Sequence, residues 1–105
     1  MNISEKKEYL SKYRLQQAKI NRLTEMLDTF PEEQKKYRQQ LLEARQLRDS
    51  IESEIEAIGD DTLIEILSQK YMCGRSLNSI AIYMNYSTRH IERLHKKALQ
   101  LFKES

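Results

Sequence analysis

The chain has 105 residues, of which 39% are hydrophobic and 32% charged, and its net charge is +2. No apolar run is long enough to span a membrane, and we expect no secretion signal, because the N-terminal residues are charged rather than apolar. The single cysteine, Cys73, allows no internal disulfide, so we expect a cytoplasmic protein.

Three breaks divide the chain into predicted helices. Only two Gly and one Pro are present, which favours long helices because both residues are unfavourable inside one. Pro31 should end a helix over residues 4–29 and begin another over 31–58, since the residue before proline avoids the α region. Residues 59–61 and 73–76 each supply a helix stop followed by cap residues, and so bound a third helix over 61–73.

The first two helices are predicted to form a hairpin. In residues 31–58 the apolar positions step alternately by four and three, which is typical of a coiled-coil seam. Arg48 interrupts this seam, and Leu47 beside it can fill the position. Because the connection at Pro31 is short, the helices should be antiparallel, so we predict a coiled-coil-like hairpin over residues 1–58. The seam and the facing positions are Tyr37, Leu41, Ala44, Ile51, Ile55 and Ile58, and Tyr9, Leu10, Tyr13, Ile20, Leu23 and Leu27.

This hairpin is also predicted to self-associate. Two such helices alone bury little core, and the apolar residues Leu15, Met26 and Leu42 lie off the seam. A second copy of the chain or the C-terminal domain could cover them. We therefore predict a homodimer formed through residues 1–58.

Residues 77–96 fit the frame of a helix-turn-helix. The first helix needs a small residue where it touches the second, and that residue is Ala81. The turn needs positive φ and has Asn85, a non-Gly residue that tolerates this conformation. Ser87 then caps the second helix. We expect apolar contacts at Ile80, Met84, Tyr86, Ile91 and Leu94, a covering helix that contributes Leu63, Ile64, Leu67 and Tyr71, and an anchor at Ala98, Leu99 and Phe102.

The last helix is predicted to meet DNA. Residues 61–105 carry seven Lys or Arg and four Asp or Glu, a net charge of +3, which weakly favours a nucleic-acid partner. With Ile91 and Leu94 facing inward, the outward face can offer Arg to guanine and Glu to cytosine, while other polar groups contact phosphates. The predicted base-facing residues are Thr88, Arg89, Glu92, Arg93 and Lys96, and the predicted phosphate contacts are Ser87, Lys97 and Arg75. His90 and His95 are expected to flank this surface, with His95 partly packed.

Nothing in the sequence indicates an enzyme. His90 and His95 are five residues apart and do not share a helical face as an i, i+4 ligand pair would. There is no Gly-rich phosphate loop, and the acidic residues are scattered along helices. We expect no metal and no cofactor.

Residues 67–102 resemble region 4 of sigma-70-type factors, and more closely the same domain in small phage and prophage proteins with an N-terminal coiled coil. Late-gene activators of the RinA and ArpU kind share this layout. The resemblance departs at Ser79, where these families usually have Glu, and at Asn85, which replaces the usual turn Gly. The matching residues are Tyr71, Gly74, Leu77, Ile80, Ala81, Met84, Tyr86, Ser87, Arg89, His90, Ile91, Arg93, Leu94, His95, Ala98 and Leu99.

The resemblance implies an all-α protein with a helical hairpin over 1–58 and a DNA-binding domain over 61–105, encoded by a bacterial host or a prophage. The chain is too short to include the other sigma-factor domains, so we expect a sequence-specific, duplex-DNA-binding transcription regulator rather than a self-sufficient initiation factor. Two alternatives stay open: a DNA-packaging component such as a small terminase-like subunit, and an adaptor that binds RNA polymerase. The positions of Ser87, Arg89 and Arg93 favour DNA over the adaptor but hardly separate regulation from packaging.

Overall fold

The computed structural model describes residues 1–104, and over this range the protein is all-helical, as predicted. No helix in the described part of the chain is both long and apolar enough to cross a membrane. The elements, in chain order, are α1 (Ile3–Thr29), the 3₁₀ turn η1 (Pro31–Glu33), α2 (Gln34–Glu56), α3 (Asp61–Leu67), the π-helical turn η2 (Ser68–Met72), α4 (Leu77–Met84) and α5 (Thr88–Leu101).

Short polar side chains set the beginnings of these helices. Asn2 and Glu5 form a reciprocal capping box at the start of α1, with N···O distances of 2.8 and 3.1 Å. Asp60 caps α3 by accepting a hydrogen bond from the Leu63 amide at 3.1 Å. The second helix was predicted to begin at Pro31, which is wrong: residues 31–33 form a 3₁₀ turn in which Glu33 N–H bonds to the Phe30 carbonyl.

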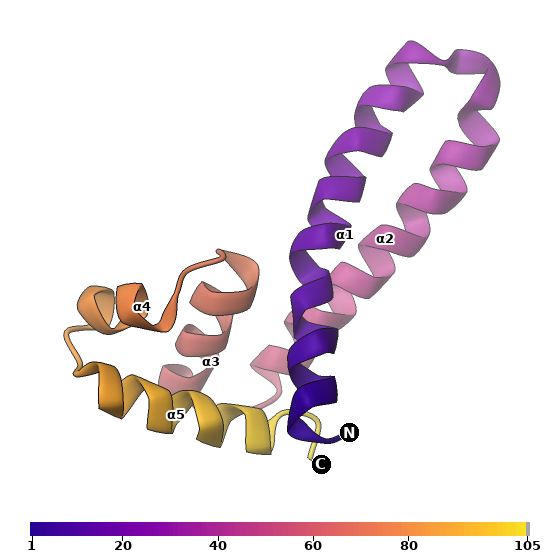
Figure 1. Ribbon diagram of the computed structural model, residues 1–105. Helices are drawn as coiled ribbons and strands as arrows, with labels where there is room; N and C mark the ends of the chain where they lie inside the picture. The colour runs from indigo at the N-terminus through magenta and orange to yellow at the C-terminus, as the bar shows by residue number, and fades with distance from the viewer. Residues whose placement is uncertain (105) are drawn as a thin grey trace.

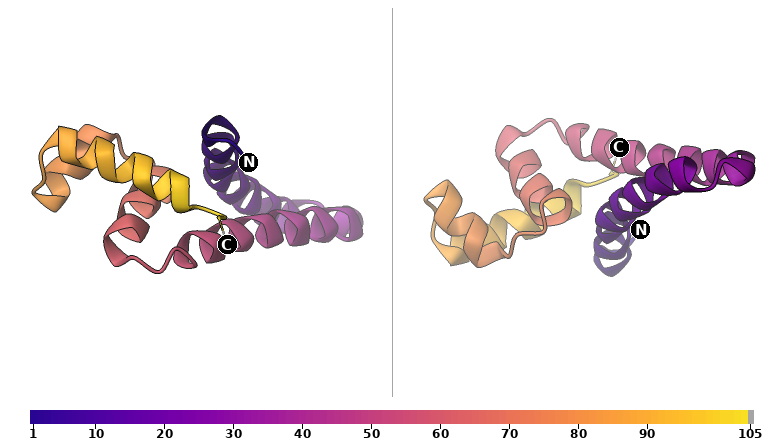
Figure 2. Two further views of the ribbon diagram at one scale, coloured as in Figure 1. Left: turned by 90° about the horizontal axis from the view of Figure 1, so that it is seen from below. Right: turned by 90° about the horizontal axis from the view of Figure 1, so that it is seen from above.

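The helices form an elongated molecule of 52 × 30 × 22 Å. α1 and α2 run side by side in opposite directions and project away from α3, α4 and α5 (Figure 1). Toward the end that holds the N-terminus α1 and α2 splay apart, and the C-terminal end of α5 approaches the opening between them (Figure 2). Lys6 of α1 donates hydrogen bonds to backbone carbonyls at the end of α5, so the last helix is in contact with the first.

Three apolar clusters hold these elements together. The distal part of the α1–α2 pair is packed through Ile20, Leu23, Leu41 and Ala44. α3, α4 and α5 meet around Ile66, Ile80, Ala81 and Ile91. The largest cluster joins residues from both sides of position 60, so the segments 1–58 and 61–105 share a core: its members are Leu10, Ile51, Ile55, Leu63, Leu67, Tyr71, Ala98, Leu99 and Phe102.

The predicted seam of the α1–α2 pair is found, with Leu47 packed in place of Arg48. Arg48 is half-buried and donates to Gln17 Oε1 at 3.2 Å, while Leu47 packs against the largest cluster. Leu15 and Leu42, predicted to lie off the seam, are 55% and 50% exposed. Met26 is half-buried.

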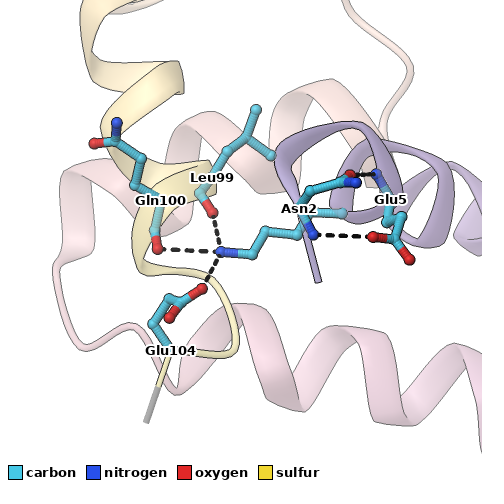
Figure 3. Close-up of polar contacts among 6 residues, drawn as sticks. Asn2, Glu5, Leu99, Gln100 and Glu104 are labelled. Atoms are coloured by element: carbon cyan, nitrogen blue, oxygen red, sulfur yellow. Dashed lines mark hydrogen bonds and ion pairs between the residues drawn. The ribbon is translucent and has the colours of Figure 1, made fainter.

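Lys6 is a buried cation that the sequence analysis did not single out. Its side chain is 2% exposed, and its Nζ donates to the carbonyl oxygens of Leu99 at 2.8 Å and Gln100 at 3.1 Å (Figure 3). Nζ also pairs with Glu104 Oε1 at 2.8 Å, and the hydrogen bond and charge of Lys6 lower the pKa of that carboxyl. The last carbonyls of a helix lack intrahelical partners and carry partial negative charge, so Lys6 satisfies the end of α5 from α1.

Candidate nucleic-acid interface

A short turn, residues 85–87, connects α4 to α5. Asn85 ends α4 in the left-handed conformation, with φ 60° and ψ 41°, as its sequence position predicted. The Tyr86 amide donates to the Ala81 carbonyl at 2.9 Å. Ser87 then caps α5, its Oγ accepting from the His90 amide at 3.1 Å. These local hydrogen bonds stabilise the turn between α4 and α5 with Asn85, and not glycine, in the left-handed position.

The contact between α4 and α5 depends on a small residue. Ala81 is 2% exposed and lies in the cluster with Ile80 and Ile91, where a longer side chain would hold the helices apart. The predicted apolar contact at Tyr86 is wrong. Its side chain is 39% exposed, and its ring lies edge-on to His90 with 5.0 Å between centroids. The backbone bond of the turn places this ring over the start of α5 rather than between the helices.

The outer face of α5 is strongly basic. Arg89, Arg93, Lys96 and Lys97 are exposed there with Thr88 and Glu92. Within residues 1–104 none of these four cations is ion-paired. The side chain of His90 is half-buried, and its Nδ1 contacts Nη2 of Arg93. This face therefore presents four exposed cations and one carboxylate, Glu92, on the helix that follows the turn.

Arg75 is the one predicted contact residue that lies away from α5 and its cap. It precedes α4, and its guanidinium lies 4.4 Å from the centre of the Tyr83 ring. Its Nη1 donates to Gln69 Oε1 at 3.3 Å. These contacts hold a half-buried cation in place beside the start of α4.

The expected packing of His95 is confirmed, but its predicted place beside the exposed face is wrong, because it lies on the opposite side of α5. It is 6% exposed, and its Nε2 is 2.9 Å from the Tyr71 hydroxyl. Burial, together with the charges of Lys70 and Lys7, lowers the pKa of His95 to about 4. The residue is therefore a neutral link between α5 and η2. No group of three or more His, Cys, Asp or Glu in the described chain is placed to hold a metal ion.

The lowered pKa of His95 makes stability depend on pH. The unfolded chain takes up a proton near the ordinary value of 6.5, whereas the folded chain does so only near pH 4. The free energy of unfolding should therefore decrease as the pH falls from about 6.5 to about 4. Urea denaturation at a series of pH values measures this. His95→Gln, which keeps a polar partner for Tyr71, should flatten the profile in that window, and His90→Gln should not. An equally steep profile in His95→Gln would contradict the assignment.

Two further cations were missed by the sequence analysis. Arg14 of α1 and Lys70 of η2 line a hollow together with Arg75. No local spacing connects Arg14 with residues 70–76, because the contact arises only when α1 packs against η2.

Comparison of the chain with protein-family models, with curated proteins and with solved structures gave no match. The geometry and charge of α4, α5 and their neighbours are therefore the basis for assigning a function.

Proposed function

We propose that this protein binds duplex DNA sequence-specifically as a phage-type transcription regulator, with α4 and α5 forming a helix-turn-helix and α5 entering the major groove. The observation that carries the proposal is the row of unpaired cations on the outer face of α5, which begins directly after the left-handed turn at Asn85. A recognition helix meets base edges with its first turns, and DNA supplies the missing negative charge.

The exposed residues fall into two groups, those that can contact base edges and those that can contact phosphates. Arg89 and Arg93 can form paired hydrogen bonds with guanine, and Glu92 can accept from cytosine. Contact of His90 with Arg93 orients that guanidinium. The residues proposed to complete the interface are Thr88 and Lys96 on the same face, and Ser87, Lys97 and Arg75 toward the phosphates.

The resemblance of residues 67–102 to region 4 of sigma-70-type factors supports action at bacterial or prophage promoters, in the cytoplasm of the host. The α1–α2 hairpin then serves as an arm that brings two copies together.

Substitutions on α5 test the proposal. Duplexes bound by the native chain are selected from a random pool, and the site is located by footprinting. Arg93→Ala should weaken binding to the selected site by about 1–3 kcal/mol, because a base contact is lost. Lys97→Ala should weaken selected and unselected duplexes by a similar factor and lower the salt dependence by about one phosphate contact. If Arg93→Ala binds the selected site as tightly as the native chain, Arg93 is not part of the interface.

The arm is proposed to form a homodimer. Leu15 and Leu42 are exposed on α1 and α2, and Leu42 borders a shallow hollow with Leu27, Arg38 and Arg45. Paired DNA-binding domains require recognition helices about 34 Å apart, a distance that the 52 Å length of the molecule accommodates.

Light scattering of the full chain at tens of micromolar should give twice the monomer mass. Leu42→Lys should shift it toward the monomer, because it adds a third cation beside Arg38 and Arg45 in the contact between the two copies. Ile82→Lys, at a position 82% exposed on α4, is the matched control and should stay dimeric. A monomeric native chain would contradict the dimer.

One observation favours a second candidate, an adaptor that binds RNA polymerase. Ile82 and Tyr83 on the outer face of α4 are 82% and 68% exposed, and exposed apolar side chains that adjoin one another are typical of protein contacts. The footprinting experiment separates the candidates, because an adaptor protects no DNA on its own.

A further inference from the structure

α1 and η2 meet beside the start of α4 and leave a hollow of about 420 Å³. Three cations from three segments line it: Arg14 from α1, Lys70 from η2 and Arg75 from the loop before α4. The hydroxyl-bearing residues Ser11 and Ser76 complete its polar rim. None of the lining residues is acidic, and within residues 1–104 no carboxylate forms an ion pair with any of the three cations.

Arg14 can lie in this hollow because residue 74 is a glycine and has no side chain. Gly74 has φ +76°, and a Cβ at this position would lie 2.5 Å from Cζ of Arg14. Any side chain at position 74 would therefore displace the guanidinium. Gly74 follows Cys73, the C-cap of η2, and adopts the left-handed conformation. The same glycine lets Arg14 of α1 approach the loop before α4.

The other two cations are held in place by aromatic rings. The Arg75 guanidinium lies 4.4 Å from the centre of the Tyr83 ring, and Lys70 Nζ lies 5.6 Å from the centre of the Tyr71 ring. Like charges gathered in one place repel one another, and no protein anion relieves that repulsion here. The missing partner is an anion, and guanidinium and ammonium groups together suit phosphate oxygens.

We infer that this hollow binds a backbone phosphate of duplex DNA, so that α1 contributes to the interface as well as α5. The inference rests on the proposed function. A polymer backbone fits the site better than a free anion, because the hollow is open on the surface and its basic character continues along α1. Lys7, Ser11 and Arg14 recur at i, i+4 and i+7 and so share a face of that helix.

Arg14→Gln in the full chain tests the inference, with DNA affinity measured at several salt concentrations on a random-sequence duplex and on a selected site. Losing one phosphate contact should weaken both by a similar factor, about 5–10-fold at ~0.1 M salt, and reduce the slope of log affinity against log salt by about 0.9. Lys12→Gln is the matched control. It removes the same charge from an exposed position on the same helix, roughly 200° around the axis from Arg14, and should leave both quantities unchanged.

A parallel titration with inorganic phosphate, followed by the NMR signals of the backbone amides of residues 70–76, distinguishes a phosphate of the DNA backbone from a free phosphate ion. Native-like DNA affinity and salt slope in Arg14→Gln would overturn the inference, and saturable phosphate binding by the native chain would then assign the hollow to a free anion. A native chain that binds no duplex would overturn the proposed function together with this inference. DNA binding that weakens in Arg93→Ala but not in Arg14→Gln would overturn the inference alone.

Discussion

Phe102→Ala should lower the free energy of unfolding by about 3–5 kcal/mol, as is typical for removing a fully buried aromatic ring. Phe102 is 0% exposed and belongs to the cluster that contains Leu10, Ile51 and Ile55. Its ring centroid lies 6.1 Å from that of Tyr9. The substitution would leave a cavity where α1, α2 and the end of α5 meet, and neighbouring helices would fill it only in part.

Urea denaturation followed by circular dichroism measures this effect. Leu101→Ala is the matched control, because this neighbour is 47% exposed and its truncation should change stability by no more than about 0.5 kcal/mol. Since the cluster joins both halves of the chain, the native protein should unfold in one transition. Equal losses in the two variants would show that Phe102 does not hold the halves together.

Lys6→Met should destabilise the protein by about 3 kcal/mol. Methionine preserves most of the buried stem but removes the ammonium, so the carbonyls of Leu99 and Gln100 lose a charged donor. Hydrogen bonds to a charged group contribute about 1.5–3 kcal/mol each, and the favourable interaction with the end of the α5 dipole is lost as well.

The control is Lys7→Met, which makes the same change at an exposed neighbour and should have little effect. Denaturation at low and high salt adds a second measurement. The loss in Lys6→Met should be nearly independent of salt, because screening is weak for a buried group. If Lys6→Met is as stable as the native chain, water must hydrogen-bond to the carbonyls of Leu99 and Gln100 as favourably as Lys6 does.

Local features of the fold could be predicted because nearby residues determine them. The left-handed conformation at Asn85 and the caps at Ser76 and Ser87 each depend on a backbone and a side chain within a few positions. The beginning of the second helix was misplaced because a 3₁₀ turn and an α-helix tolerate the same residues after Pro31. Helix ends of this kind are decided by one or two hydrogen bonds.

Contacts between distant segments could not be predicted. Lys6 shares a helical face with Leu10 and Tyr13, so its spacing was compatible with burial. The carbonyls to which it donates lie 93 and 94 residues later in the chain, and no local pattern indicates them. Of the candidate interface, the basic face of α5 followed from its amphipathic pattern. The approach of Arg14 to Gly74 depends on how α1 packs on η2, which no periodicity specifies.

The bond between Lys6 and Glu104 also has a kinetic consequence. It joins residues 98 positions apart, so forming it closes a loop of almost the whole chain, at an entropic penalty on the order of 4 kcal/mol before any constant is added. The contacts within the α1–α2 pair and within α3–α5 span far shorter loops and can form first. Docking of α1 on the end of α5 then belongs to the last stage of folding. Because this contact is so distant in sequence, we expect the protein to fold more slowly than helical bundles of similar size whose contacts are all local.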